Sequence, residues 1–535
     1  MEAEETKIIG KHHWSIVLIT FFLVFALLLT FIIDVEKSFA ADETQSVQIT
    51  NYIDINKFGA VGDGKTDDTK AFLQAVQQKG ILRLESGKTY LISSTIKVDL
   101  TNIKGIQANN AKILLNADFP AFYIKGNKTK GGAEPPSNLG LEQEFSAVIE
   151  GLHVFSANHQ GTALVLDGTF GVIISKSHFY NLKKGIEIIN RNRNVIITEN
   201  HLWDMAEYAI HYNNASLHQS IISNNHISYA KVALFFENGD VHNVQINSND
   251  IEIGYSINNN TQSAIQVVCD KLNTQFSQAQ IVGNTIEDHF LAKGGIVNFY
   301  SKVFETPTKN SDQPPYVGMI ELVGNELSGS SKALVLENIN DLSVNGNNFK
   351  LIKEVFIAIY TAAEGTNISG NIFSGKVEKN YGGKVLKVEG AKAGNASALR
   401  YFNFNNNTSY NLSDNPISIK RRDGVKADFQ VSDLNISNNT FASLSRTKDS
   451  LNLNGYMVDI NVPYINGVSI NSNIITGGSI NENGLRLSAN TYSNIIIKDN
   501  IIKGLIARKG SNPIIYNLPK SDGKSILVKD NIPIK

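Results

Sequence analysis

Histidines and acidic side chains recur at matched positions between residues 176 and 270, and both types transfer protons. Two neighbouring apolar runs carry Glu187 and His211 at equivalent positions, which predicts a carboxylate beside an imidazole. Glu237 follows in the next run as a second carboxylate, and hydrolysis of a glycosidic bond needs two carboxylates about 5 to 9.5 Å apart. The predicted catalytic residues are Glu187, His211, Glu237, Asp204 and Glu207.

Aromatic and basic side chains accompany these carboxylates, and such side chains suit the binding of a sugar. Tyr180 and Trp203 offer flat apolar faces on which a sugar ring packs. Arginines receive the carboxylate of an acidic sugar. The predicted substrate-binding residues are Tyr180, Trp203, His178, His201, His226, Arg191 and Arg193. A plainer interpretation, in which these residues form a solvated ladder under a loop, stays open.

A further group of acidic side chains is suited to binding Ca²⁺, which prefers oxygen ligands. Cleavage of a uronic acid by elimination needs a base at C5 and a cation, either Arg or Ca²⁺, that neutralises the sugar carboxylate. The predicted calcium ligands are Asp250, Glu252, Glu287 and Asp288. The sequence has no zinc-type Cys/His spacing, no phosphate-binding glycine loop and no Gly-x-Ser-x-Gly elbow. Hydrolysis and elimination both stay open.

The elements that must position these side chains are short strands marked by a recurring Asn-x-apolar signature. The signature runs from Asn200-His201-Leu202 to Asn500-Ile501-Ile502 and returns about once per two dozen residues. Each copy follows a β-branched run, such as 195–197, that is too short for a helix. Such a repeat predicts a solenoid of stacked strands, a parallel β-helix. The Asn is expected at a corner, in left-handed backbone, with its amide bonded to the next coil.

Equivalent residues of adjacent coils are expected about 4.8 Å apart, with side chains alternating inward and outward. The residue after each Asn then faces outward. This predicts one outward row of His178, His201, His226 and Asp250, and a second row of Tyr180, Trp203, Ser228 and Glu252. A third row, on the next strand, contains Glu187, His211, Phe235 and Gln266.

The N-terminal part of the chain contains an uninterrupted apolar run at 14–33, which is long enough to cross a bilayer. Lysines precede this run and acidic residues follow it, so the positive-inside rule places the rest of the chain outside the cytoplasm. Small residues at 38–41 form a cleavage site, and both a cleaved signal peptide and a retained anchor stay open. We expect an extracellular protein, either secreted or held by this run at the outer face of the cytoplasmic membrane.

Composition excludes other classes of protein. The net charge of −1 carries no basic excess, which argues against nucleic acid as the partner. Cys269 is the only cysteine, so an internal disulfide is impossible.

The sequence divides into seven predicted parts. They are a cytoplasmic n-region at 1–13, the apolar run at 14–33, a linker at 34–51, an N-terminal cap and first coil at 52–100, a β-helix at 101–373, an irregular insertion or degenerate coils at 374–433, and C-terminal coils at 434–535.

The string Phe58-Gly59-Ala60-Val61-Gly62-Asp63-Gly64-Lys65-Thr66-Asp67-Asp68-Thr69 resembles the opening motif of the pectate-lyase superfamily. The resemblance implies an all-β fold, a right-handed single-stranded parallel β-helix, and a polysaccharide as substrate or ligand. The residues themselves predict a glycine turn followed by a helix, capped by Thr66 or Asp67 and running to about Lys79, that covers the open end of the solenoid. Asp67 and Asp68 are therefore interpreted as structural.

Departures from the family leave the reaction open. Polygalacturonases of this superfamily carry Asn-Thr-Asp, a mid-chain Asp-Asp, Gly-His-Gly and Arg-Ile-Lys strings, and this sequence has none of them. The leading hypothesis is an exported protein that binds and cleaves an acidic extracellular polysaccharide. The alternative is a non-catalytic β-helix that binds or organises a polysaccharide during its synthesis or export. A phage tailspike is a third hypothesis, although the run at 14–33 argues against it because tailspikes are released by lysis.

Overall fold

The computed structural model describes residues 51–126, 147–254, 260–303, 312–376, 381–390, 398–424, 429–443, 456–477, 483–503, 514–519 and 526–534. Residues 52–535 form one compact unit. The predicted n-region at 1–13, the membrane run at 14–33 and all but the last residue of the linker at 34–51 lie outside the described residues. Among the helices that are described, none has the length and apolar character needed to cross a membrane.

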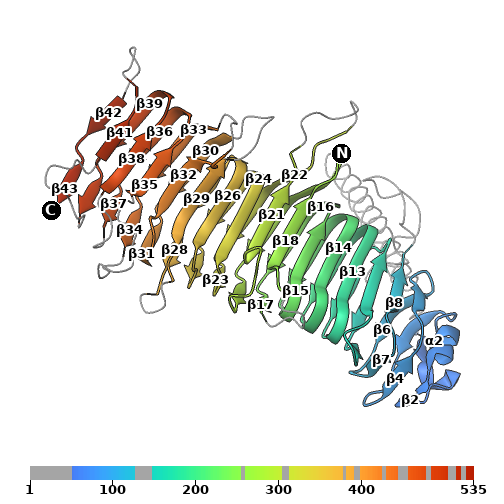
Figure 1. Ribbon diagram of the computed structural model, residues 1–535. Helices are drawn as coiled ribbons and strands as arrows, with labels where there is room; N and C mark the ends of the chain where they lie inside the picture. The colour runs from blue at the N-terminus through green and yellow to red at the C-terminus, as the bar shows by residue number, and fades with distance from the viewer. Residues whose placement is uncertain are drawn as a thin grey trace, which may run out of the picture. The chain divides into compact units, whose positions relative to one another are not determined.

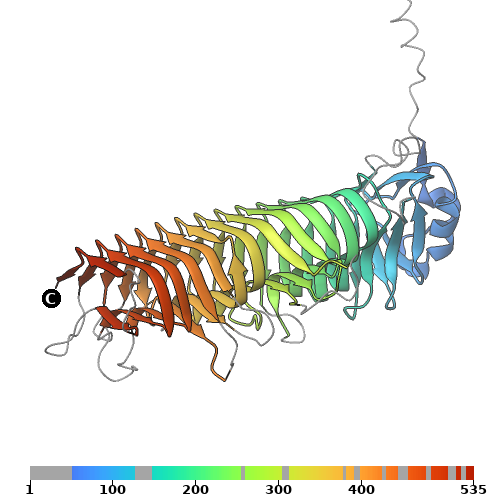
Figure 2. The same cartoon turned by 90° about the horizontal axis from the view of Figure 1, so that it is seen from above.

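The unit is a parallel β-helix, which confirms the predicted fold (Figures 1 and 2). Three sheets run along it. Sheet 1 contains β10 (His153–Ser156), the first parts of β13 (His178–Thr198), β14 (His201–Ser223) and β15 (His226–Glu237), then β17 (Asp250–Ile253) and β20 (Thr285–Asp288). Sheet 2 contains β11 (Thr162–Asp167), the middle of β13 and β14, the end of β15, β18 (Ser263–Cys269) and β21 (Val297–Ser301). Sheet 3 contains β12 (Ile173–Ser175), the ends of β13 and β14, β16 (Asp240–Asn247), β19 (Gln275–Val282), β22 (Tyr316–Val323), the end of β24 (Lys332–Asn345) and β27 (Asn367–Ser369).

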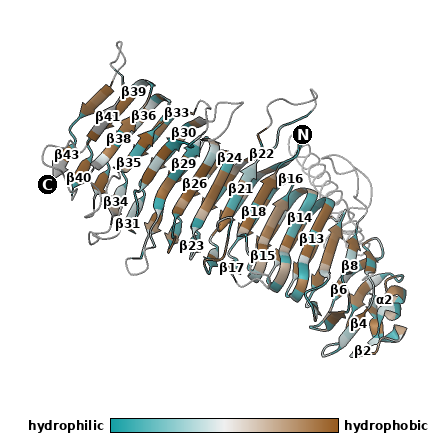
Figure 3. Cartoon of the chain, in the orientation of Figure 1, coloured by the Kyte–Doolittle hydropathy of each residue, from teal (hydrophilic) through white to brown (hydrophobic). Residues whose placement is uncertain are grey.

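Inward side chains of the three sheets form one continuous apolar core. Ile186, Ile210, Leu234 and Ile265 lie one above another and are all fully buried. Hydrophobic residues recur in this way on coil after coil (Figure 3). Each coil buries its apolar residues against the coils on either side of it, so the core exists only in the stack.

Buried asparagines join the coils at the corner between sheets 3 and 1. The backbone N–H and the side-chain amide of Asn284 both donate to Oδ1 of Asn325, at 3.0 and 2.9 Å. The same pattern runs from Asn200 to Asn531. Asparagine suits this position because its side chain donates and accepts at once. The predicted left-handed backbone of the Asn itself is wrong, since the left-handed residue is the one before it, such as Glu199 with φ 57°.

The repeat continues through the segment 374–433, where the sequence analysis expected an insertion or degenerate coils. Asn407 accepts from Asn371 and donates to Asn439. The pairing strands here are β29 (Lys384–Gly390), β30 (Ala398–Asn405), β31 (Thr408–Leu412), β32 (Ile417–Arg421) and β33 (Gln430–Ser437). The Asn407 copy was missed because its third residue is Ser409, which is buried although polar.

The N-terminal end carries the predicted capping helix, but the helix is shorter than expected. Helix α2 (Thr69–Ala75) begins after the strand β2 (Asp63–Asp67), so neither Thr66 nor Asp67 is its N-cap. The carboxylate of Asp68 is buried and accepts from the backbone N–H groups of Val61 and Gly62, at 2.6 and 3.1 Å. These bonds fix the glycine turn, as expected of a structural Asp67–Asp68 pair.

Candidate functional site

Three of the predicted catalytic residues meet on the outer surface of sheet 2. We call Glu187, His211 and Glu237 the carboxylate cluster. Their strands are neighbours, and the pairing sets Glu187 beside His211 and Asn213 beside Glu237. His211 Nδ1 lies 3.4 Å from Glu187 Oε1, and His211 Nε2 lies 3.0 Å from Glu237 Oε2. One imidazole therefore lies between two carboxylates.

Aromatic rings cover this imidazole although it points outward from the sheet. Phe235 stacks on His211 with ring centroids 5.1 Å apart, and the Tyr208 ring lies 4.5 Å away. Only 3% of the His211 side chain is exposed, against 36% of Glu237. Water is thus largely excluded from the imidazole, while Glu237 reaches the solvent.

The two carboxylates have different surroundings. Glu187 Oε1 accepts from Lys184 Nζ at 2.7 Å and from Asn213 Nδ2 at 3.0 Å. Burial alone raises the pKa of Glu187, but the close contact with His211 and the hydrogen bond and charge of Lys184 outweigh it and lower the pKa to about 2. Glu187 therefore stays ionised at neutral pH and is unsuited to donate a proton. Glu237, with 36% of its side chain exposed, is the carboxylate that a ligand can reach.

Tyr208, Phe235, Lys184 and Lys231 belong to this site, and the sequence analysis missed them in that role. The ammonium groups of Lys184 and Lys231 lie 5.7 and 5.8 Å from the centre of the Tyr208 ring. Burial raises the pKa of Tyr208, and the charges of nearby carboxylates, Glu207 first among them, raise it further. Alternation gave no signal for Lys184, because it stands two residues before the inward Ile186, and the register shift between Leu182 and Lys184 breaks the simple counting.

Three other predicted residues lie apart from the cluster. Asp204 is at the turn between sheets 1 and 2, where its carboxylate is 2.9 Å from His159 Nε2. Arg191 and Arg193 lie beyond the turn at Asn190 and pair with the positions of a different stretch of β14. The turn carries the arginines away from sheet 2, so the prediction that they share its groove is wrong. Glu207, by contrast, lies within the bulge between Met205 and Tyr208 and is close enough to raise the pKa of the Tyr208 phenol.

Sheet 1 carries the predicted histidine row. The rings of His178 and His201 stack at 4.6 Å, and those of His201 and His226 at 4.5 Å. His153 is a fourth member, 5.6 Å from His178, that was missed because Leu152 stands where the signature has Asn. Trp203 is 36% exposed in the predicted aromatic row beside it. In that row Tyr180 stacks on Phe155 at 5.0 Å.

Acid is expected to destabilise the fold through this histidine row. Burial, together with the charges of neighbouring histidines, lowers the pKa of His178 to about 4, and burial also lowers the pKa of His153 and His201. The unfolded chain then binds more protons than the folded chain below pH 6.5, so stability is complete above that pH and is lost as the pH falls toward 4. Urea unfolding at pH 7 and pH 5 measures the loss. His178→Asn is expected to reduce the difference between the two midpoints, and an equal difference in both proteins would refute this explanation.

The predicted calcium ligands are only partly brought together. Asp250 and Glu252 lie on the outer surface of sheet 1, and their carboxylates and the imidazole of His226 all lie within 4.8 Å of one another. Glu287 pairs with Glu252 and is exposed on the same surface. Asp288 is wrong as a ligand, because it is 1% exposed and accepts from the N–H groups of Leu291 and Ala292. An imidazole nitrogen suits transition metals better than Ca²⁺.

No family model matches the chain, and no curated protein matches it. Among solved structures it is similar to a tailspike protein double mutant of E. coli bacteriophage HK620, with a TM-score of 0.48, 11% identity, and coverage of 90% of this chain and 78% of that one. It is also similar to the A-module of mannuronan C-5 epimerase AlgE4 of Azotobacter vinelandii, with a TM-score of 0.43, 14% identity, and coverage of 74% and 96%. A third is the catalytic unit of a GH87 α-1,3-glucanase of Streptomyces thermodiastaticus, with a TM-score of 0.39, 10% identity, and coverage of 90% and 69%.

Proposed function

We propose that this protein binds an acidic polysaccharide across sheet 2 and cleaves it with Glu237 as the acid–base group. The observation that carries the proposal is the position of His211, a covered imidazole 3.4 Å from Glu187 and 3.0 Å from Glu237. An outward carboxylate–imidazole–carboxylate cluster of this kind is not needed to hold the β-helix together. The apolar core and the asparagines already do so.

The different positions of the two carboxylates around His211 explain why Glu237 would be the reacting group. The ionised Glu187 favours a hydrogen on His211 Nδ1. His211 Nε2 lies 3.0 Å from Glu237 Oε2, at the end of the cluster that is open to solvent. A substrate on the surface therefore meets Glu237 before the other two side chains of the cluster. Glu187 is in this account a positioning residue, and Glu237 is the catalytic residue.

Charge near the cluster supports an acidic sugar as substrate. The ammonium groups of Lys184 and Lys231 both lie within 6 Å of the centre of the Tyr208 ring, and an aromatic ring is a surface on which a sugar packs. A cation that neutralises a uronic acid carboxylate is what elimination requires. Export to the cell exterior, by the run at 14–33, and Ca²⁺ as an additional cation at Asp250, Glu252 and Glu287 are part of the same proposal.

Digestion of a panel of polysaccharides tests the proposal. The products are read both as new reducing ends and as the ultraviolet absorbance of unsaturated sugars, with and without EDTA. Absorbance that disappears with EDTA indicates a cation-dependent lyase, and reducing ends without absorbance indicate a hydrolase. No product from any member of the panel would refute the proposal of an enzyme.

A non-catalytic polysaccharide-binding protein is the second candidate, and the burial of His211 favours it. An imidazole that is only 3% exposed cannot itself contact a sugar. On this view the cluster merely fixes the shape of the binding surface. Saturable binding that is unchanged in Glu187→Gln and Glu237→Gln, without product in the panel, would support this candidate.

A further inference from the structure

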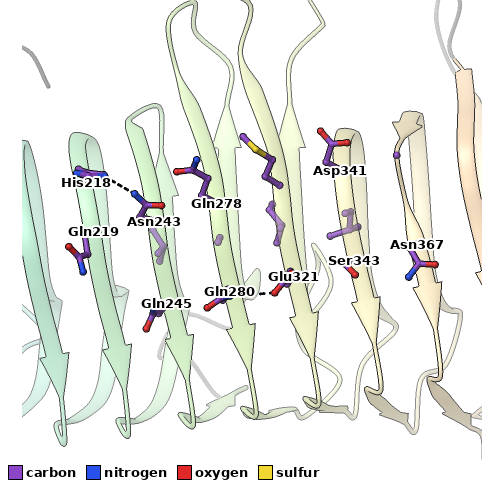
Figure 4. A pocket seen from close by; sticks show the side chains of 16 residues that line it. His218, Gln219, Asn243, Gln245, Gln278, Gln280, Glu321, Asp341, Ser343 and Asn367 are labelled. Carbon is purple, nitrogen blue, oxygen red and sulfur yellow. Dashed lines mark hydrogen bonds between the residues drawn. The ribbon is translucent and has the colours of Figure 1, made fainter.

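A groove with a volume of ≈ 940 Å³ crosses the outer surface of sheet 3, on a different sheet from the carboxylate cluster (Figure 4). It passes over the coils from β14 to β27. We call it the amide groove because most of its polar side chains are amides. These polar residues are His218, Gln219, Asn243, Gln245, Gln278, Gln280, Glu321, Asp341, Ser343 and Asn367.

Two parallel rows of side chains line the amide groove. The first row lies at a corner where each residue has left-handed backbone, and it consists of Gln219, Asn243, Gln278, Met319 and Asp341. The second row is set by strand pairing and consists of Gln245, Gln280, Glu321, Ser343 and Asn367. Neighbours within a row are one coil apart, about 4.8 Å. The groove therefore repeats its polar groups regularly along one direction, as a linear polymer repeats its own.

Several of these amides can form hydrogen bonds with a ligand because they form none within the described part of the protein. Within the described part of the chain, the side chains of Gln219, Gln245 and Gln278 have no hydrogen-bond partner, and all three are exposed. The asparagines at the other corner have the same coil spacing, yet each of their amides bonds the next one. An amide offers donors and acceptors together, which is what neighbouring hydroxyls of a sugar require.

The charge of the amide groove indicates whether a polymer bound there is charged or neutral. Its lining contains no lysine or arginine, while Glu321 and Asp341 are both acidic. A negatively charged polymer would be repelled here, in contrast to sheet 2 with its lysines. Met319 is 45% exposed among polar neighbours, and its thioether side chain offers an apolar contact to the face of a sugar ring.

We infer that the amide groove is a second polysaccharide-binding site, that it takes an uncharged chain, and that it acts independently of the carboxylate cluster. It would hold the protein on a neutral polysaccharide while sheet 2 acts on an acidic one. The inference does not rest on the proposed reaction. Binding in the groove is expected to persist whether or not the protein cleaves anything.

Affinity electrophoresis of the full chain tests this inference. The gels contain a soluble neutral polysaccharide, such as a galactomannan or a mixed-linkage glucan, or else polygalacturonate as the charged probe. Retardation by at least one neutral polymer is expected in wild type and, equally, in Glu237→Gln. The double variant Gln245→Ala/Gln280→Ala is expected to bind about tenfold more weakly, since two hydrogen-bonding side chains are lost.

Ser469→Ala is the matched control, because Ser469 lies on the same row of outward residues three coils beyond Asn367 and outside the groove. It is expected to bind like wild type. The inference is overturned if no neutral polysaccharide retards the wild-type protein, or if the double variant and the control bind alike. Loss of neutral binding in Glu237→Gln would also overturn it, because the two sites would then be one.

Discussion

Glu237→Gln is expected to lower the rate of polysaccharide cleavage by about 10²- to 10⁴-fold, the usual contribution of a general acid or base. Glutamine has the shape of glutamate, and its carbonyl oxygen still accepts a hydrogen bond from His211 Nε2, which lies 3.0 Å from the carboxylate in the native protein. The side chain no longer exchanges a proton. The expected loss therefore lies in kcat, with little change in KM, and initial rates across a range of polysaccharide concentrations measure it.

Glu326→Gln serves as the matched control, because Glu326 is a half-exposed carboxylate on another sheet, paired with Lys350 at 2.9 Å. This variant should cleave at the wild-type rate. Glu187→Gln should lose less activity than Glu237→Gln and should shift the pH–rate profile, since Glu187 acts through His211. Cleavage by Glu237→Gln at the wild-type rate would contradict the role given to Glu237.

The rows of outward residues could be predicted from the sequence because two simple rules determine them. Side chains alternate along a strand, and one Asn per coil sets the register between coils. Aligning Asn200 with Asn225 therefore also aligned His201 with His226. One coil earlier, aligning the variant copy at Ser177 with Asn200 aligned His178 with His201. The same counting brought Glu187 beside His211, which the structure confirms at 3.4 Å.

The sequence analysis failed at the turns. A turn changes the direction of the backbone by an amount that the repeat of Asn-x-apolar does not indicate. Arg193 is only six residues from Glu187, but the left-handed Asn190 between them moves it to another part of the coil. Asp288 immediately follows the outward Glu287 and so faces inward, where the N–H groups of the next loop bind it. The bulge before Tyr208 likewise hid the position of its ring beside His211, whereas alternation had already placed Phe235 next to His211.

Asn325→Ala is expected to lower the free energy of unfolding of the solenoid by about 3 to 5 kcal/mol, which is a large effect for the loss of one buried side chain. Asn325 is 2% exposed, and its Oδ1 accepts from both the backbone and the side chain of Asn284. Its Nδ2 donates to Ile281 O at 2.8 Å and to Asn347 Oδ1 at 2.9 Å. Alanine removes all four of these bonds and leaves the buried backbone N–H of Asn284 without its acceptor, although Asn284 Nδ2 keeps its bond to Ile246 O and Asn347 Oδ1 keeps its bond from the Asn325 N–H. The free energy of unfolding in urea measures the cost.

The way in which this variant unfolds tests whether the coils are held together as the structure implies. Stability in a solenoid is a sum over neighbouring coils, so weakening one junction should separate the unfolding of the coils on its two sides. We therefore expect Asn325→Ala to unfold at a lower urea concentration and in two steps. Asn403→Ala removes an outward asparagine and should change the free energy of unfolding by no more than about 0.5 kcal/mol. If both variants unfolded like wild type, the buried amides would contribute nothing beyond the apolar core, and the recurrence of asparagine at this corner would need another cause.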